Sequence, residues 1–312
     1  MTLAILCPGQ GWQNPDMFAL TGEAPEASSL FSYAATLLGG RDPRDYVRTE
    51  TSQAIHRDRA GQILCTIQAL AAAVALRESM QGRIIVAGYS VGEVAAWGVA
   101  RLFDATDTLD LVARRAEAMD AASLPGDGLL FVRGLSRVNV DRLCERYEAA
   151  VAIVNPGDAF VLGGGRTALQ AIANAAKAMN AAKAIELPVE VASHTRRLAT
   201  ASAKFRESLR EVSVRISPTA GPRVLSGVDG SPVIRVDVGL DKLAAQISQT
   251  VQWASCLQGC MEAGATAFLE LGPGRALSKM VAGAYRDVPT RSLEDFKTLE
   301  GARLWLARHA GG

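Results

Sequence analysis

A serine between two glycines is the residue of this chain best placed to do chemistry. Ser90 lies in the sequence Gly-Tyr-Ser-Val-Gly-Glu of residues 88–93, directly after the apolar run 84–87. A β-branched run followed by Gly-x-Ser-x-Gly and a helix-forming stretch is the pattern of a nucleophile elbow. The helix N-terminus behind the serine favours the negative charge of an oxyanion. We therefore predict that Ser90 forms a covalent ester; the alternative is a buried serine in a glycine-rich turn.

A serine nucleophile needs a base, and the chain holds only three histidines. His56 lies in a charged segment and His309 lies close to the end of the sequence. His194 follows the alternating run 187–193, at the predicted junction of two structural units, where clefts usually form. Elimination and position favour His194 as the general base. The alternative is a structural histidine at the end of a strand.

Backbone N–H groups near Ser90 could stabilise an oxyanion. One belongs to Val91, the residue after the predicted nucleophile. A second could come from the glycine-rich loop 8–12, which follows the first predicted strand. Loops at the carboxyl ends of parallel strands meet at one edge of a sheet, so we expect this loop near Ser90. A glycine-rich loop alone is also compatible with a simple turn or a phosphate cradle.

Arg115 is a charged residue beside the apolar stripe of a predicted helix over residues 106–121. Its neighbours three and four positions away are apolar, so no local acid can pair with it. A guanidinium there needs a distant partner or an anionic ligand, and a carboxylate fits its geometry. An ion pair between elements is the alternative. Arg114, in contrast, is expected on the solvated face, where Asp110 and Glu117 can pair with it.

The composition limits the classes of function. The chain has 312 residues, is 49% hydrophobic and 21% charged, and carries a net charge of +1. Because this balance is ordinary and the sequence shows no leader or long apolar run, we expect neither nucleic acid nor a membrane as partner. The five cysteines form no C-x-x-C pair, which indicates reduced thiols and a cytoplasmic location. Cys256 and Cys260 share a helix face, but with so few histidines we expect no metal site.

The elements that must position these residues alternate between strand and helix. Strands are predicted at residues 3–7, 83–87, 223–226 and 266–271, and helices lie between them, for example at 62–78 and 106–121. This alternation predicts an α/β fold with a mainly parallel sheet.

Residues 127–190 follow a different pattern. Strands are predicted at 128–132, 150–154, 160–163 and 184–187, with helices at 139–147 and 166–179 and a turn at 156–158. The order β-α-β-β-α-β is typical of a ferredoxin-like unit. We therefore predict a small domain, 127–190, inserted into a large domain made of residues 1–126 and 191–312.

Taken together, these residues resemble the malonyl-CoA:acyl-carrier-protein transacylase family. The resemblance covers most of the chain and includes Arg115 at the family's spacing from the serine. Its further motifs are Pro-Gly-Gln-Gly at 8–11, Gly-Tyr-Ser-Val-Gly-Glu at 88–93, Asn155, Leu-Pro-Val at 187–189 leading to Ser193 and His194, Val-Gln-Trp at 251–253, and Glu-Leu-Gly-Pro-Gly at 270–274. Their order and spacing are highly specific in combination. The family fold is a hydrolase-like α/β domain with an inserted ferredoxin-like subdomain.

The resemblance implies a role for each matching residue. Ser90 would be acylated and His194 would be its base. The backbone N–H groups of Gln10 and Val91 would form the oxyanion hole. Arg115 would bind the free carboxylate of the malonyl group.

Two further residues receive roles from the resemblance. The backbone carbonyl of Gln246 would orient the histidine, so that no aspartate is required, and Asn155 would help to order the site. The implied partners are malonyl-CoA and an acyl carrier protein with a phosphopantetheine-type arm. No bound cofactor is implied.

Some positions depart from the fatty-acid-synthesis members. Tyr89 replaces the usual histidine, Thr195 follows the catalytic histidine, and Trp12 is bulky for its place. Three stretches resemble the malonyl transferase (epsilon) subunit of biotin-independent malonate decarboxylase: Gly-Tyr-Ser-Val-Gly-Glu at 88–93, Ala-Ser-His-Thr at 192–195 and Met-Phe-Ala-Leu at 17–20. That branch implies a carrier protein with a dephospho-CoA-derived arm, and other decarboxylase subunits as partners. The alternative is the same transfer in fatty acid or polyketide synthesis.

Two alternatives come from other classes. An α/β-hydrolase esterase shares the elbow, and acids between Ser90 and His194 are compatible with its chain order. Arg115 argues against it, because water needs no carboxylate clamp. A non-enzymatic docking scaffold is disfavoured because Ser90, His194, Arg115 and Gln10 are all present.

Overall fold

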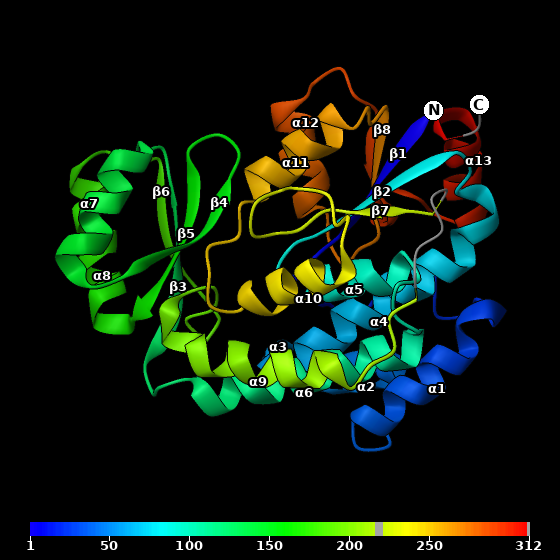
Figure 1. The fold of residues 1–312 in the computed structure, drawn as a ribbon, viewed down its shortest axis with the longest axis horizontal. Coiled ribbons are helices and arrows are strands. Elements are labelled where there is room, and N and C mark those ends of the chain that lie inside the picture. The colour runs from blue at the N-terminus through cyan, green and yellow to red at the C-terminus, as the bar shows by residue number, and fades with distance from the viewer. Residues whose placement is uncertain (216–220, 311–312) are drawn as a thin grey trace.

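A parallel sheet forms the centre of the larger part of the molecule. The computed structural model describes residues 1–215 and 221–310. Within them the strand order is β7-β2-β1-β8-β9, and every pairing is parallel. The strands are β1 (Thr2–Cys7), β2 (Arg83–Gly88), β7 (Arg223–Val224), β8 (Ala267–Glu270) and β9 (Thr290–Ser292). The predicted α/β fold with a mainly parallel sheet is therefore confirmed (Figure 1).

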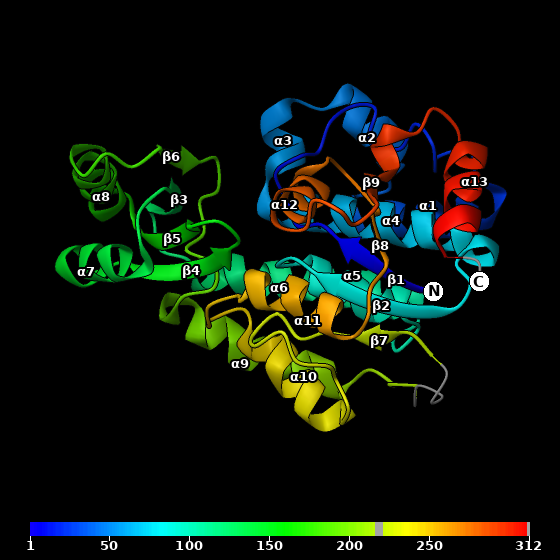
Figure 2. The same cartoon turned by 90° about the horizontal axis from the view of Figure 1, so that it is seen from above.

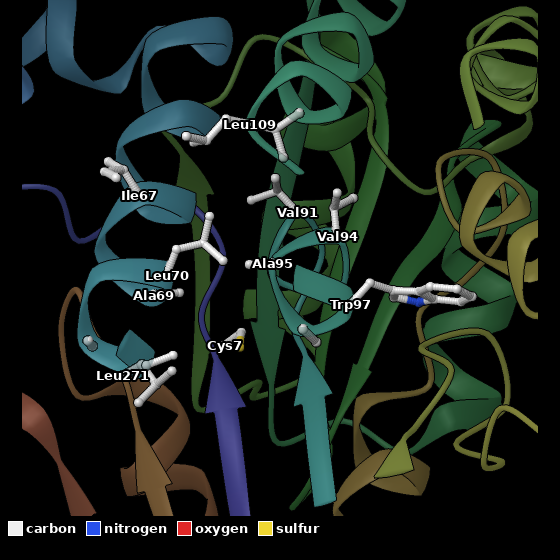
Figure 3. Close-up of a cluster of buried hydrophobic side chains, with 14 of the residues drawn as sticks. Cys7, Ile67, Ala69, Leu70, Val91, Val94, Ala95, Trp97, Leu109 and Leu271 are labelled. Atoms are coloured by element: carbon white, nitrogen blue, oxygen red, sulfur yellow. The ribbon is translucent and has the colours of Figure 1, made fainter. Parts of the chain in front are cut away.

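Helices cover both faces of this sheet, and its strands are therefore buried on both sides. Leu3 and Ile5 of β1 belong to a core with α4 (Asp58–Leu76), α5 (Gly92–Val99) and α6 (Ala105–Ala122). Leu6 faces the opposite core, with α11 (Trp253–Glu262) and α12 (Ala276–Ala284). Figure 2 shows α4 and α11 on opposite sides of the sheet. In Figure 3, Leu70 of α4 points toward Ala95 of α5.

The other helices of this part lie around the same core. They are α1 (Ser28–Leu37), α2 (Pro43–Thr49), α3 (Ser52–His56), α9 (Ala199–Arg210), α10 (Val236–Ala245) and α13 (Leu299–His309). Helix α4 begins four residues before the predicted start, because Asp58 and Arg59 continue it into a charged stretch that resembles a loop.

Within residues 1–215 and 221–310, one helical segment, Asp58–Ser79, is long and apolar enough to cross a membrane by length and composition alone, although no apolar run of that length was expected. The mean hydropathy of an 18-residue stretch of this segment is 1.4, and 89% of that stretch is buried inside the protein. Its apolar residues contact the sheet and neighbouring helices, which is the usual reason for such a composition in a core helix.

A second, antiparallel sheet stands apart from the first, at the left in Figure 1. Its strand order is β4-β5-β3-β6, from β3 (Asp127–Arg133), β4 (Ala150–Asn155), β5 (Ala159–Gly165) and β6 (Lys183–Leu187). Helices α7 (Arg137–Tyr147) and α8 (Arg166–Ala178) complete the expected strand-helix-strand-strand-helix-strand order. A separate hydrophobic core, including Leu130, Phe160 and Ile172, lies between these elements. The domain boundaries 127–190 stay a prediction.

Specific contacts join the second sheet to the larger part of the molecule. Val154 N–H donates to the carbonyl of Val251 and Val251 N–H donates to the carbonyl of Ala152, both at 2.9 Å. Asp127, at the start of β3, accepts a hydrogen bond from Arg197 Nε at 2.9 Å. These contacts fix the end of β4 and the segment after His194 relative to one another.

Candidate active site

Ser90 lies on a sharp turn between β2 and α5. Its φ is 56°, in the left-handed region that a non-glycine residue rarely adopts. A Cβ on Gly92 would lie 2.0 Å from the carbonyl oxygen of Cys7, and a Cβ on Gly88 would lie 2.1 Å from the Gly92 carbonyl carbon. Only glycine fits at both positions, so the turn packs directly against β1.

His194 contacts the Ser90 hydroxyl. The distance from His194 Nε2 to Ser90 Oγ is 2.8 Å, and Nδ1 lies 2.6 Å from the backbone carbonyl oxygen of Gln246. Because a carbonyl oxygen only accepts hydrogen bonds, Nδ1 carries the proton and donates it. Nε2 is then free to accept the hydroxyl proton of Ser90. The arrangement can therefore activate the serine with a backbone carbonyl in the place of a carboxylate.

The environment keeps this imidazole neutral. His194 is 2% exposed, and burial together with the positive charge of Arg115 lowers its pKa to about 3, against the opposing hydrogen bond to Gln246. A neutral imidazole at ordinary pH is the form that can accept a proton.

The loop after β1 lies beside Ser90. Cys7 and Gly88 are partners in the parallel pairing of β1 and β2, and Tyr89 N–H donates to the Cys7 carbonyl at 2.9 Å. A Cβ on Gly9 would lie 3.4 Å from Ser90 Cβ. Gln10 follows in this loop, and Val91 is the N-cap residue of α5. Both are next to the nucleophile in the fold, and their role in an oxyanion hole stays a prediction.

Arg115 on α6 is buried and is held by two neutral amides. Nη1 donates to Gln62 Oε1 at 2.6 Å and Nη2 donates to Gln246 Oε1 at 3.3 Å. Within residues 1–215 and 221–310 no carboxylate forms an ion pair with it. Burial lowers its pKa to about 10, against the charges of Asp58 and Glu93, so the guanidinium stays protonated at neutral pH.

Arg114 lies on the solvated face of α6, as expected, but it does not pair with the expected acids of that helix. It is exposed and pairs with Glu211 of the segment after α9. Asp110 accepts from the Tyr33 hydroxyl at 2.8 Å, and Glu117 pairs with Arg59 at 3.1 Å. The expected pairs within α6 are therefore wrong, because tertiary packing supplies each acid with another partner.

Gln246 connects Arg115 to the nucleophile. Its Nε2 donates to the backbone carbonyl of Ser90 at 2.9 Å and to Glu93 Oε2 at 2.7 Å, while its own backbone carbonyl orients His194. Its side chain is therefore as central as its main chain. Sequence reasoning missed Glu93, and the only signal was its place in the motif of residues 88–93.

Gln62, which holds Arg115, and Asp58 were also missed. Gln62 is fully buried on α4, and its Nε2 donates to Asp58 Oδ2 at 2.8 Å. The signal that could have found it is a polar residue in an otherwise apolar stretch of helix.

Asn155 ends β4 and lies beside the turn that carries Ser90. It is 4% exposed, and among the described residues its side-chain amide has no hydrogen-bond partner. Tyr89 packs edge-on against Trp253 at 5.3 Å, and burial raises its pKa to about 12, against the effect of the nearby Asn155 side chain. Asn155 therefore lies at the end of β4 that faces the larger part of the molecule, next to the site.

Trp12 and the cysteines complete the surroundings. Trp12 is 57% exposed and contacts the backbone at Gly274. All five cysteines are free and buried. Cys256 Sγ lies 3.4 Å from the Ser226 carbonyl oxygen, and the expected absence of a metal site stays a prediction.

Comparisons with known proteins identify the family. The family model described as "Acyl transferase domain" matches residues 60–300. The chain is 31% identical over 299 residues to the malonyl CoA-acyl carrier protein transacylase of Mycobacterium bovis, covering 94% of this chain and 96% of that protein. It is 29% identical to the protein of that name from Escherichia coli, covering 88% and 90%.

Solved structures agree with this result. The crystal structure of the Mycobacterium tuberculosis enzyme is 28% identical, covers 100% of both chains and superposes with a TM-score of 0.87. The acyl-carrier-protein S-malonyltransferase of Burkholderia pseudomallei is 26% identical, covers 97% of this chain and 100% of that chain, and has a TM-score of 0.89. The chain is an acyltransferase and belongs to the malonyl-CoA:acyl-carrier-protein transacylase family.

Proposed function

We propose that this protein moves malonyl from malonyl-CoA to the thiol of an acyl carrier protein in fatty acid or polyketide synthesis. The observation that carries the proposal is the link between Arg115 and the Ser90–His194 pair through Gln246. A buried cation that pairs with no carboxylate in the described part of the chain, and that is joined to an activated serine, suits an acyl group that ends in a carboxylate. The names of the curated relatives support the same substrate and acceptor.

The mechanism uses one ester and two thioesters. His194 Nε2 takes the proton of Ser90 as Oγ attacks the thioester carbonyl, and the N–H groups of Gln10 and Val91 stabilise the oxyanion. When the tetrahedral intermediate collapses, the C–S bond breaks and His194 returns the proton to the CoA sulfur. The carrier thiol then attacks the malonyl ester, His194 accepts its proton, and Ser90 recovers that proton as it leaves. Asn155, beside the turn, would help to order the site.

The malonate decarboxylase role is the second candidate. Tyr89 and Thr195 favour it as departures from the fatty-acid enzymes, whereas the names of the relatives favour the first. The two differ in the acceptor. Transfer only to a carrier with a phosphopantetheine arm would support fatty acid or polyketide synthesis. Transfer only to a carrier with a dephospho-CoA-derived arm would support the malonate decarboxylase role, with the other decarboxylase subunits as partners.

Radiolabelled malonyl-CoA tests the proposed chemistry directly. Without carrier, wild-type enzyme should retain label on Ser90 and release malonate slowly, while Ser90→Ala should retain none and keep its fold by circular dichroism. Fast, steady release of malonate would support the esterase. A Ser90→Ala variant that still transfers malonyl would place the nucleophile elsewhere.

We propose a hydrolase-like larger domain and a ferredoxin-like inserted domain, which the strand order β4-β5-β3-β6 and its two helices support. Five free cysteines support a cytoplasmic location.

A further inference from the structure

The hydrogen bonds around Arg115 form two similar arms. In the first, Gln62 accepts from Arg115 at 2.6 Å and donates to Asp58 at 2.8 Å. In the second, Gln246 accepts from Arg115 at 3.3 Å and donates to Glu93 at 2.7 Å. Each arm therefore has the order arginine, glutamine amide, carboxyl group, and the reaction mechanism uses neither acid.

These arms are enclosed. Gln62, Glu93, Arg115 and Gln246 are each 1% exposed or less, and the Asp58 oxygen Oδ1 is buried too. A buried guanidinium is normally satisfied by direct contact with a carboxylate. Here both carboxyl groups are close enough to influence the pKa of Arg115, yet an amide stands between each of them and the guanidinium.

The amides have a fixed direction in these arms. A glutamine can accept a hydrogen bond from Arg115 through Oε1 only while its Nε2 points away from the guanidinium. In each arm a carboxyl oxygen, of Asp58 or of Glu93, accepts the hydrogen bond from that Nε2. The acids therefore hold both amides in the orientation that presents oxygen to Arg115. They also balance part of its charge without occupying its donors with a carboxylate.

We propose that Gln62 and Gln246 are positioning residues that separate Asp58 and Glu93 from Arg115, so that the guanidinium stays available for the carboxylate of the acyl group. The inference deepens the proposed function and rests on it. It assigns acyl selectivity to four residues around Arg115 as well as to the arginine itself.

The sharpest test moves the carboxylate from position 58 to position 62, next to Arg115. The double variant Asp58→Asn and Gln62→Glu keeps the number of charges and a hydrogen bond between positions 58 and 62, and it places the carboxylate directly against Arg115. The internal acid should then compete with the substrate carboxylate. We expect the ratio of kcat/KM for malonyl-CoA to that for acetyl-CoA to fall by about tenfold or more, mainly through a higher KM for malonyl-CoA.

A matched control exists on the surface of α11. Gln258 donates to Glu262 at 2.7 Å, an exposed pair with the same spacing of four residues. The exchange Gln258→Glu with Glu262→Gln should leave the ratio unchanged. An unchanged ratio in the folded 58/62 variant, or equal losses for both acyl groups, would overturn the inference.

The single variant Gln62→Glu keeps the proposal testable if the double variant does not fold. It places a carboxylate against Arg115, and a proton shared between the new carboxyl group at position 62 and Asp58 limits the repulsion between the two acids. The ratio should again fall by about tenfold or more; an unchanged ratio in the folded variant would overturn the inference. If the wild-type enzyme forms no malonyl ester, the proposed function itself is wrong, whatever the variants show.

Discussion

At the scale of single residues, we expect Arg115 to set which acyl group the site prefers. Malonyl and acetyl thioesters share the reacting carbonyl and differ in the distal carboxylate. Because hydrogen bonds to charged groups contribute about 1.5–3 kcal/mol, Arg115→Ala should lower kcat/KM for malonyl-CoA about 10- to 150-fold. Acetyl transfer should be unchanged or faster. Arg115→Lys should recover part of the loss, since an ammonium cannot reproduce the planar fork.

The neighbouring arginine provides the control for this experiment. Arg114 is exposed and pairs with Glu211, so Arg114→Ala should change neither activity. Steady-state kinetics with both thioesters measure the difference. Equal losses for malonyl and acetyl in Arg115→Ala would show that the arginine supports the fold and would contradict the carboxylate role.

The depressed pKa of His194 predicts the acid side of the pH profile. Protonated imidazole cannot take the Ser90 proton, so acylation falls as the pH drops through the pKa of the folded enzyme. With that pKa at about 3, the rate at pH 5.5 should stay near its value at pH 7.5. An ordinary histidine would be about 90% protonated at pH 5.5.

The measurement is the rate of malonyl-enzyme formation between pH 5 and 8. Burial raises the pKa of Glu93 to about 7, which adds a second titration near the site. Glu93→Gln removes it and should be measured in parallel. An inflection near pH 6.5 in both proteins would contradict a depressed His194 pKa.

At the scale of elements, the turn between β2 and α5 depends on the absence of a side chain. A methyl group on Gly92 would meet the Cys7 carbonyl at 2.0 Å, and neither backbone can yield without moving the turn. We expect Gly92→Ala to lower the free energy of unfolding by about 3 kcal/mol or more and to abolish acylation.

Gly165 is the matched control for the turn. It precedes α8 with a φ of −68°, and no atom lies within 4 Å of its Cβ position. Gly165→Ala should therefore change stability by about 0.5 kcal/mol or less. Urea unfolding of both variants gives the comparison, and similar small effects would mean that the turn tolerates a side chain.

Local patterns were enough to predict most of these elements. The elbow, the strands of the parallel sheet and the strand-helix order of residues 127–190 follow from spacing and periodicity within short stretches. Periodicity also placed Arg115 on an apolar face. It could not supply Gln62 or Glu93 as neighbours, because those contacts depend on how α4, α5 and α6 pack together. It also missed β9, a three-residue strand at the sheet edge.

At the scale of the whole molecule, one ion pair joins the second sheet to the segment that carries His194. Asp127 is 1% exposed and accepts from Arg197, three residues after the histidine, and from Leu124 N–H at 3.1 Å. Asp127→Ala leaves that N–H unsatisfied and frees the segment. We expect unfolding to become easier by about 1–3 kcal/mol and kcat to fall.

An exposed pair in the same sheet domain serves for comparison. Asp141 pairs with Arg137 at 2.8 Å on the surface of α7, so Asp141→Ala should cost about 0.5 kcal/mol or less and leave kcat unchanged. Thermal melts compare the stability of the two variants, and steady-state kinetics compare their kcat. If Asp127→Ala has full activity, the ion pair between the second sheet and the segment after His194 does not position the histidine.

The buried cysteines have a consequence for a reaction whose leaving group and acceptor are both thiols. An exposed thiolate would intercept the malonyl group or form mixed disulfides with CoA. Each cysteine is at most 6% exposed, and burial raises the pKa of every thiol. The protein therefore offers no competing sulfur of its own: its acyl group should be held through oxygen alone, and alkylating reagents specific for thiols should leave the enzyme active.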